Sequence, residues 1–251
     1  MVATDISIIT ATYNAAEFLN DYFKSIRSQT SSRFELIIID GKSTDESTSI
    51  IEKNIDIIKY CESERDDGVY DAWNKGLAHA IGQYIMFLGS DDLLESRAIE
   101  KYVAFIDSTN EAWDIISSKA IYTNKNGYPL GVFGDKWTWR NIKRNMCVSH
   151  VGMLTNRKIF EKIGNFSLEY KMCADYDLML RAGANLKAAF LDRVTVKMRT
   201  GGISFTVKAI GEAFRIKKKR LNGRFVLSAI EAILALSLFL RMKIRISLSA
   251  I

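Results

Sequence analysis

Two adjacent aspartates, Asp91 and Asp92, follow a run of apolar residues that ends at Gly89-Ser90. Neighbouring carboxylates repel each other and cannot be buried without a partner, so the pair must lie where the apolar segment ends and a cation can approach. Mg²⁺ and Mn²⁺ prefer carboxylate oxygens, take one or two of them from a protein, and complete their coordination with water and substrate phosphates. The pair therefore indicates a divalent-metal site. The structural alternative is that one aspartate caps the next helix, with Glu95 in its first turn.

Other polar residues in the first half of the chain also follow apolar segments. Asn14, Asp40 and Asp91 come directly after such segments, and Asp66-Asp67 follows another. The apolar, β-branched segments predicted as strands cover residues 5–10, 34–39, 55–61 and 83–88, and the segments with helical spacing cover residues 18–26, 46–54, 68–80 and 96–106. Strands that alternate with helices predict a parallel sheet covered on both faces, and such sheets bind ligands beyond the carboxyl ends of their strands. These polar residues should therefore meet at one edge of the sheet.

The second half of the chain has a mixed pattern. Strands are predicted over residues 113–121 and 151–155, helices over 157–163 and 175–182, and edge strands over 186–198. We expect three parts, over residues 1–106, over residues 107–212, and a basic, apolar tail over 213–251.

Composition and absent motifs exclude several classes of protein. With 251 residues, of which 48% are hydrophobic, the chain can bury a full core. It has no GxGxxG, no GxxxxGK[ST] and no GxSxG motif, which argues against dinucleotide oxidoreductases, P-loop NTPases and Ser-His-Asp hydrolases. Three widely spaced cysteines predict a reduced compartment without disulfides, and the start of the chain lacks the pattern of a signal peptide. We expect a cytoplasmic protein.

Positive charge is concentrated in the tail. From Ala213 onward there are nine basic residues against Glu231 alone, whereas the first 212 residues carry 26 basic and 28 acidic side chains. This argues against a nucleic-acid binder and for one localised anionic partner. The run from Phe225 to Leu240 is shorter than a membrane-spanning helix and contains a charge, so an interfacial helix on the anionic cytoplasmic face of a membrane is the favoured interpretation. The alternative is a helix packed on the domain or in an oligomer interface.

Four ordered blocks of sequence resemble the family 2 glycosyltransferases of the GT-A fold, especially bacterial enzymes that build surface polysaccharides. The blocks are SIITATYNAAEFL, IIIDGKSTDES, SERDDGVYDAWNKGLAHAIGQYIMFLGSDD and CADYDLMLRAG. The resemblance covers about residues 5–204, and it implies that residues 1–106 form a nucleotide-sugar-binding half and residues 107–212 an acceptor-binding and catalytic-base half. It implies a Rossmann-like, mainly parallel sheet flanked by helices and an inverting transfer of a sugar from a nucleotide diphosphate, usually UDP, to an acceptor hydroxyl. With the tail, it points to a lipid-linked saccharide acceptor in polysaccharide or O-antigen synthesis.

The resemblance also implies roles for individual residues. Asp175 would be the catalytic base, and Asp91 would bind Mn²⁺ or Mg²⁺. Contacts to the donor nucleotide would come from Thr10, Thr12, Tyr13, Asn14, Asp40, Asp66 and Asp92. Weaker candidates for contacts to the acceptor or the diphosphate are His150, Trp137 and Arg199, with Gly201, Gly202 and Ser204 near the pyrophosphate.

Two positions depart from the family pattern. Relatives often have Asp at position 89 and Glu at position 174, where this chain has Gly89 and Ala174. The reaction needs only one base near the acceptor hydroxyl and one cation near the leaving diphosphate, so the reaction class is retained. The alternatives are a nucleotidyltransferase, which would want a glycine- and lysine-rich loop after the first strand, and a non-catalytic sugar-nucleotide-binding or scaffold subunit of a polysaccharide assembly complex.

Overall fold

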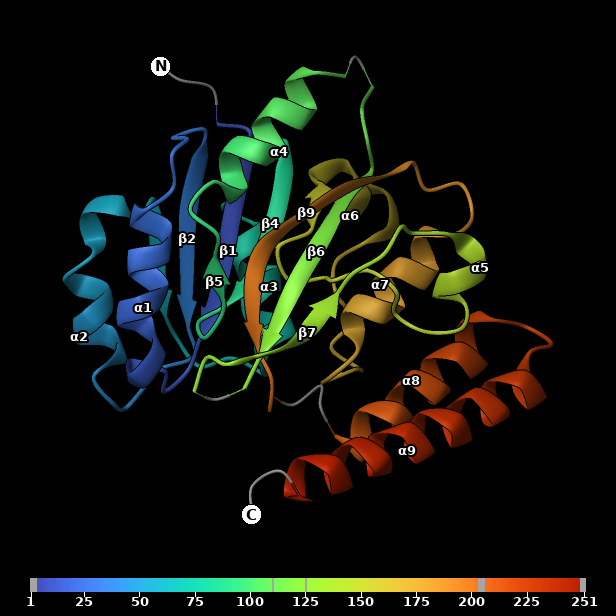
Figure 1. Cartoon of the computed structure of the whole chain (residues 1–251). Helices are drawn as coiled ribbons and strands as arrows, with labels where there is room; N and C mark the ends of the chain where they lie inside the picture. Colours follow the sequence, from blue (N-terminus) through green and yellow to red (C-terminus); the bar gives the residue numbers. More distant parts are fainter. Residues whose placement is uncertain (1–3, 110, 125, 203–205, 249–251) are drawn as a thin grey trace.

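A computed structural model of the chain describes residues 4–109, 111–124, 126–202 and 206–248. Within these residues the strands form one nine-stranded sheet with helices on both faces (Figure 1). The strands are β1 (Ile6–Thr12), β2 (Phe34–Asp40), β3 (Tyr60–Ser63), β4 (Tyr84–Gly89), β5 (Leu93–Leu94), β6 (Ile115–Thr123), β7 (Pro129–Phe133), β8 (Leu154–Asn156) and β9 (Ala188–Arg199). The helices are α1 (Ala16–Arg27), α2 (Ser47–Glu52), α3 (Val69–Leu77), α4 (Ala98–Asp107), α5 (Trp139–Ile142), α6 (Arg157–Ile163), α7 (Ala174–Ala182), α8 (Val207–Arg220) and α9 (Phe225–Leu248).

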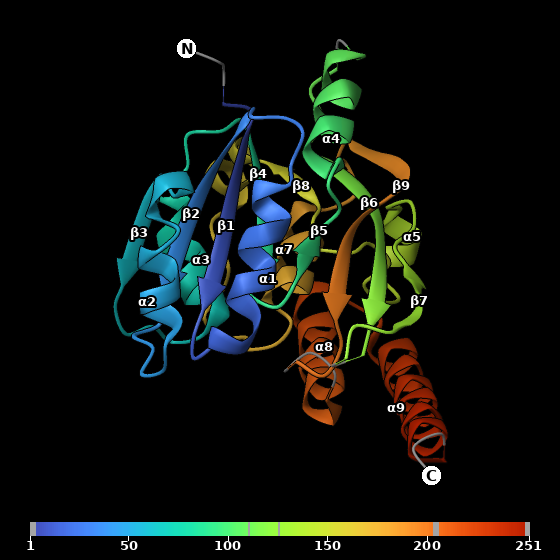
Figure 2. The same cartoon turned by 60° about the vertical axis from the view of Figure 1, so that its left-hand side comes forward.

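The first half of the sheet is parallel, as predicted. Its order is β3-β2-β1-β4, and Ile8 of β1 pairs with Leu36 on one side and Met86 on the other. The sheet continues as β8-β6-β9-β5, with β7 beside β6, and antiparallel pairs join β8 to its neighbours. Figure 2 shows β1 to β4 between α1 and α2 on one face and α3 on the other. The prediction of an α/β fold with a mainly parallel sheet is confirmed.

Both faces of the parallel strands are apolar because successive side chains alternate between them. Ile8 and Leu36 pack beneath α1, whereas Ile9 and Ile37 pack against α3 on the opposite face. With both faces filled, these strands offer polar groups only at their ends. The carboxyl ends of β1, β2, β3 and β4 therefore form the edge where chemistry can occur.

The predicted strand over residues 55–61 is wrong in its first half. Ile55–Ile57 forms a 3-10 helix, and β3 begins only at Tyr60. The isoleucines of this stretch have high strand propensity, but Asp56 is held by Arg27 of α1 through two hydrogen bonds of 2.8 and 2.6 Å. This pair of hydrogen bonds at the surface holds the segment before β3 in a turn instead of a strand.

The segment predicted as edge strands over residues 186–198 is also different. It forms one strand, β9, which has neighbours on both sides: β6 pairs with it in parallel and β5 pairs with it antiparallel. The two-residue strand Leu93–Leu94 covers its outer side. A strand of two residues is too short to show the alternation of apolar and polar residues that predicts a strand. The sequence therefore does not predict the partner on this side of β9, and the segment is interpreted as edge strands.

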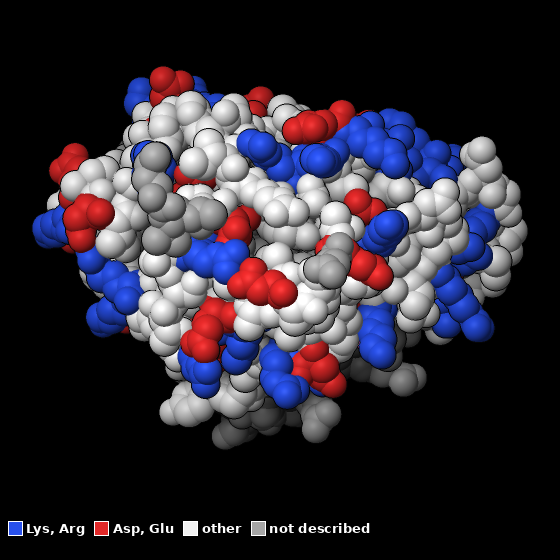
Figure 3. Space-filling view, turned by 90° about the horizontal axis from the view of Figure 1, so that it is seen from above, with Lys and Arg blue, Asp and Glu red and all other residues white. Residues whose placement is uncertain are grey.

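The tail consists of two helices rather than one. α8 and α9 lie side by side below α7 (Figure 1), and Phe214 of α8 contacts Phe225 of α9 with ring centroids 5.7 Å apart. No described helix meets the length and hydropathy needed to cross a bilayer. The predicted boundary at residue 212 falls inside α8, and the division into three parts stays a prediction. Seen from above, charges of both signs mix over most of the surface, and Lys and Arg gather at one end (Figure 3).

Candidate active site

The paired aspartates lie in the turn after β4. Asp92 is 4% exposed, and its Oδ2 accepts the backbone N–H of Gly89 at 2.8 Å. The next helix, α4, begins at Ala98 with Arg97 as its N-cap, and β5 separates it from the aspartates. The alternative that either aspartate caps this helix is therefore wrong.

The environment of the pair favours a cation. Burial raises the pKa of Asp91, and burial together with the charge of Asp91 raises the pKa of Asp92 well above its ordinary value. Arg199 lies close enough to oppose both shifts. Buried carboxylates whose pKa values are raised in this way are stabilised as anions by a divalent cation.

Gly89 is required for space at this turn. A Cβ atom there would lie 2.8 Å from Asp91 Oδ1 and 2.9 Å from Asp92 Oδ2. The two carboxylates thus occupy the volume into which a side chain at position 89 would project. This is a physical reason for glycine at position 89, where the family pattern often has Asp.

The described residues contain no group of three or more His, Cys, Asp or Glu side chains that could hold a metal by themselves. Mg²⁺ and Mn²⁺ sites that serve phosphates commonly use one or two carboxylates, with the remaining ligands from water and substrate. Asp91, with Asp92 beside it, fits that requirement. The residues present are therefore compatible with a divalent ion shared with a bound diphosphate.

Asp175 lies in the first turn of α7 and is held by a tyrosine from α3. The Tyr70 hydroxyl donates to Asp175 Oδ1 at 3.0 Å, and the backbone N–H of Tyr176 donates to the same oxygen at 2.8 Å. Burial and the charge of Asp175 raise the pKa of Tyr70 well above its ordinary value, so Tyr70 stays protonated and remains a donor. The second oxygen of Asp175 has no part in these bonds.

The backbone just before α7 is capped by a residue from the tail. Cys173, the N-cap residue, makes no side-chain cap, and Glu212 of α8 takes its place. The buried Glu212 carboxylate accepts the backbone N–H groups of Cys173 and Met172 at 2.8 Å each and that of Lys171 at 3.2 Å. A charged acceptor at a helix N-terminus satisfies donors that the helix itself cannot.

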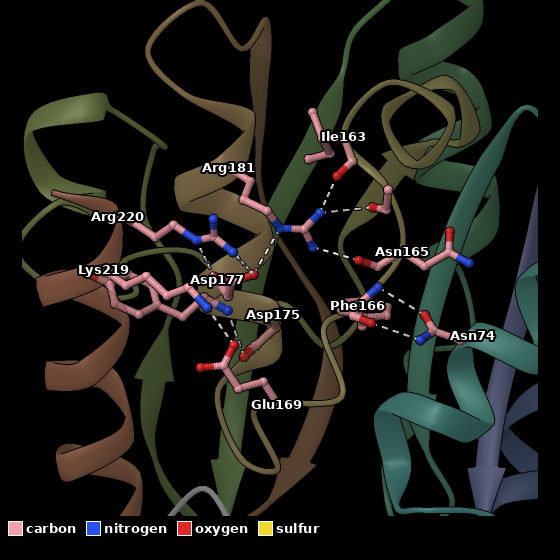
Figure 4. Close-up of polar contacts among 12 residues, drawn as sticks. Asn74, Ile163, Asn165, Phe166, Glu169, Asp175, Asp177, Arg181, Lys219 and Arg220 are labelled. Carbon is pink, nitrogen blue, oxygen red and sulfur yellow. Dashed lines mark hydrogen bonds and ion pairs between the residues drawn. The ribbon is translucent and has the colours of Figure 1, made fainter.

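A second tie joins the same two helices behind Asp175 (Figure 4). Asp177 is fully buried and accepts Arg181 Nε at 2.9 Å and Arg220 Nε of α8 at 2.7 Å. The Arg181 guanidinium also donates to backbone carbonyls of the loop after α6, including that of Asn165 at 2.6 Å. Asp177 is therefore structural, and α8 holds α7 on both sides of Asp175.

One cavity of about 740 Å³ brings most of the reacting groups together. Its lining includes Asp91, Asp92, His150, Asp175 and Arg199. His150 is buried in a stack with Phe87, with ring centroids 5.4 Å apart, and burial lowers its pKa. Its Nε2 is buried and lacks a hydrogen-bond partner within the part of the chain that the structure describes. A neutral imidazole thus has an uncommitted nitrogen at the cavity.

A second group of predicted site residues gathers at the ends of β1, β2 and β3. Asn14, with a φ of 47°, accepts the backbone N–H of Thr44 at 2.8 Å. Asp40 is fully buried and accepts hydrogen bonds from Ser43 and Ser63. Asp66 lies so close to Gly41 that a Cβ on this glycine would be 2.7 Å from Asp66 Oδ2.

The remaining predicted residues are placed as follows. Tyr13 is 64% exposed at the same edge, and the Thr12 hydroxyl is buried without a partner among the described residues. Thr10 is fully buried, and its hydroxyl bonds to Tyr22 beneath the sheet. Trp137 packs on the core and does not line the cavity. Ser204 lies outside the described residues.

Comparison of the chain with models of known protein families gives its family. The family described as "Glycosyl transferase family 2" matches residues 7–168. The chain belongs to glycosyl transferase family 2.

Individual relatives agree with this membership. A PGL/p-HBAD biosynthesis glycosyltransferase of Mycobacterium bovis is 34% identical over 215 residues, which is 82% of each chain. Among solved structures, S. aureus TarS 1-349 in complex with UDP-GlcNAc has a TM-score of 0.67 at 21% identity and covers 88% of this chain and 73% of its own. A Pyrobaculum calidifontis mannosyltransferase in complex with GDP-Man and Mn²⁺ has a TM-score of 0.62 at 17% identity, covering 86% and 65%. The chain spans 43% of a longer TarS structure. The GT-A fold is thereby confirmed.

Two residues of this family 2 chain were missed by sequence reasoning. Tyr70 lies two positions after Gly68 in the third of the four sequence blocks and is the second residue of α3, which is a local signal that could have identified it. Glu212 has no such signal, because 37 positions of sequence separate it from Asp175 and nothing in the spacing relates them. The roles assigned to individual site residues stay predictions.

Proposed function

We propose that the chain is an inverting, metal-dependent glycosyltransferase that moves a sugar from a UDP-linked donor to a hydroxyl of a lipid-linked saccharide in surface-polysaccharide assembly. The observation that carries this proposal is that Asp91, Asp92 and Asp175 line one and the same cavity. The fold neighbours in complex with UDP-GlcNAc, or with GDP-Man and Mn²⁺, support a nucleotide-sugar donor.

Asp175 accepts the proton of the acceptor hydroxyl while the hydroxyl oxygen of the acceptor bonds to the anomeric carbon from the face opposite the diphosphate. The bond from that carbon to the phosphate oxygen breaks, and the nucleoside diphosphate leaves with the electron pair. Tyr70 and Glu212 fix the position of Asp175 from two sides. Asp91, with Asp92 beside it, would hold a divalent ion, which would supply positive charge to offset the negative charge of the leaving diphosphate. Neutral His150 can bond to a hydroxyl or to a diphosphate oxygen.

Calorimetric titration of UDP, with and without Mn²⁺, tests the donor site. We expect Mn²⁺ to strengthen binding and Asp91→Ala to abolish that gain, since Asp91 is the expected metal ligand and Asp92 Oδ2 already accepts the backbone N–H of Gly89. Glu95→Ala serves as the control because Glu95 pairs with Lys197 near the same turn without lining the cavity. Binding that ignores both Mn²⁺ and Asp91 would remove the metal from the proposal.

Asp175→Asn separates an enzyme from a non-catalytic subunit. An enzyme loses transfer, measured as UDP release in the presence of an acceptor, while its affinity for UDP stays within about twofold. A binding subunit shows no turnover in the unmodified chain. The matched control is Asp177→Glu, which keeps a carboxylate next to Arg181 and Arg220.

We further propose that the protein is peripheral on the cytoplasmic face of a membrane. The outer side of α9 exposes large apolar side chains, namely Phe225, Val226, Leu227, Ile230, Ile233 and Leu234. Lys218 and Lys219 are exposed nearby on α8, which suits an anionic surface. Sedimentation with phosphatidylglycerol vesicles, but not with phosphatidylcholine vesicles, is expected. Ile233→Glu should release the protein, and equal sedimentation of this variant would contradict the proposal.

A further inference from the structure

The cavity extends well beyond the reacting groups. From Asp175 it continues between the two tail helices, where its walls include Ile210, Ala213 and Phe214 of α8 and Ala232, Leu234 and Ala235 of α9. We call this part the apolar arm. Two charged side chains of these helices line it and pair with each other, since Lys217 Nζ donates to Glu231 at 2.8 Å and also to the carbonyl of Arg144. The one other polar side chain that these two helices contribute to the described lining is Ser228, whose buried hydroxyl has no partner among the described residues.

The arm lies on the acceptor side of the site. The residues expected to hold the nucleotide, Asn14, Asp40 and Asp66, are at the ends of β1 to β3 and do not line this cavity. Because the arm is lined by residues of α8 and α9 and by none of that edge, a donor nucleotide held at the edge leaves the arm free. Walls of alanine, isoleucine and phenylalanine would leave the hydroxyls of a saccharide without partners, which is costly. An apolar group fits the arm best.

The arm opens on the exposed face of the tail. Leu234 lines the cavity and is also 56% exposed, so it marks the mouth. The neighbouring Ile230 and Ile233 are exposed and apolar, and on the adjoining helix the exposed Lys218 lies over the ring of Phe225, whereas Lys219 is paired with Glu169. Apolar surface rimmed by cations is complementary to an anionic lipid surface. The mouth therefore faces the same surface to which the tail would bind.

We propose that the apolar arm holds the apolar group of an amphiphilic acceptor, which enters between α8 and α9 from the lipid surface and presents its hydroxyl to Asp175. This inference rests on the proposed function. It narrows the substrate class to acceptors whose accepting sugar is close to an apolar chain. It also gives α9 a role in recognising the acceptor in addition to membrane attachment.

The test compares methyl, hexyl, octyl and decyl β-D-glucosides, each below its critical micelle concentration, by calorimetry on the full chain saturated with UDP and Mn²⁺. Affinity should rise by about fourfold per added methylene, because each one enters the arm. Ala232→Trp and Ala213→Trp fill the arm and should abolish this dependence on chain length. Val226→Trp, on the exposed side of α9, should keep it.

The outcomes distinguish this inference from the proposed function. If UDP binds and chain length has no effect, or if filling the arm changes nothing, the arm is not an acceptor site and the glycosyltransferase function stands. If UDP does not bind the unmodified chain, the proposed function itself fails. Retained UDP affinity shows that a variant is folded, and Ala232→Leu, which adds less volume, carries the same test should a tryptophan variant lose it.

Discussion

Replacing Glu212 with alanine should slow transfer without weakening donor binding. Glu212 accepts two N–H bonds of 2.8 Å from Met172 and Cys173, directly ahead of the turn that carries Asp175. A hydrogen bond to a charged group contributes about 1.5–3 kcal/mol. Because water can partly replace the carboxylate at these half-buried groups, we expect a loss of about 2–4 kcal/mol in the stability of this segment.

This loss converts to a rate. A difference of about 1.4 kcal/mol corresponds to a factor of ten, so kcat should fall by about thirty- to several-hundredfold if the segment must be ordered for Asp175 to act. Glu212→Gln keeps one acceptor oxygen and should recover much of the rate, to within about tenfold of the unmodified chain. Affinity for UDP should stay within about twofold in both variants.

The assay measures UDP release at saturating donor and acceptor, with calorimetry for UDP affinity. Lys208→Ala is the matched control, because Lys208 is exposed on the same helix. An unchanged kcat in Glu212→Ala would refute the positioning role. So would a parallel loss of UDP affinity and kcat, since this would indicate general unfolding.

Three further predictions follow from contacts in the site. Gly89→Ala should push the neighbouring carboxylates apart and weaken Mn²⁺-dependent UDP binding by about tenfold, with little change in melting temperature, whereas unchanged binding would show that the turn has spare room. Tyr70→Phe removes the hydroxyl that donates to Asp175 and should lower kcat by about tenfold or more at constant UDP affinity, which steady-state kinetics will test. Burial lowers the pKa of His150 from 6.5 against the opposing charge of Asp175, so the unfolded chain takes up a proton that the folded chain resists. Its contribution to stability is therefore present above pH 6.5 and is lost as the pH falls toward the folded pKa, and thermal unfolding of His150→Phe should depend less on pH in this range.

The first half of the fold could be predicted from the sequence because its signals are local. Apolar strands with turns at fixed places locate Asp40 and Asp91 at one edge without knowledge of tertiary contacts. The same reasoning failed at Ile55–Ile57, where a hydrogen-bonded contact from Arg27 overrides strand propensity. It also failed at Leu93–Leu94, which is too short to show a period.

The second half of the site depends on contacts between distant segments. Asp175 was identified through its resemblance to a family, since its local pattern predicts only the start of a helix. Tyr70 and Glu212 reach the same turn from α3 and α8, and no periodicity records such a meeting. The cavity between α8 and α9 likewise arises only when both helices are packed.

The two ties from α8 to α7 make the tail and the reaction centre energetically dependent on each other. Suppose that a surface binds the tail only in molecules in which Glu212 and Arg220 hold α7. That surface must then also raise the fraction of molecules with Asp175 in place. Thermodynamic linkage is reciprocal, so a ligand that orders the turn at Asp175 must strengthen the binding of the tail to its surface by the same factor. Enzyme molecules in solution would then rest with a loosened site, and those at a surface carrying acceptor would be both better retained and more active.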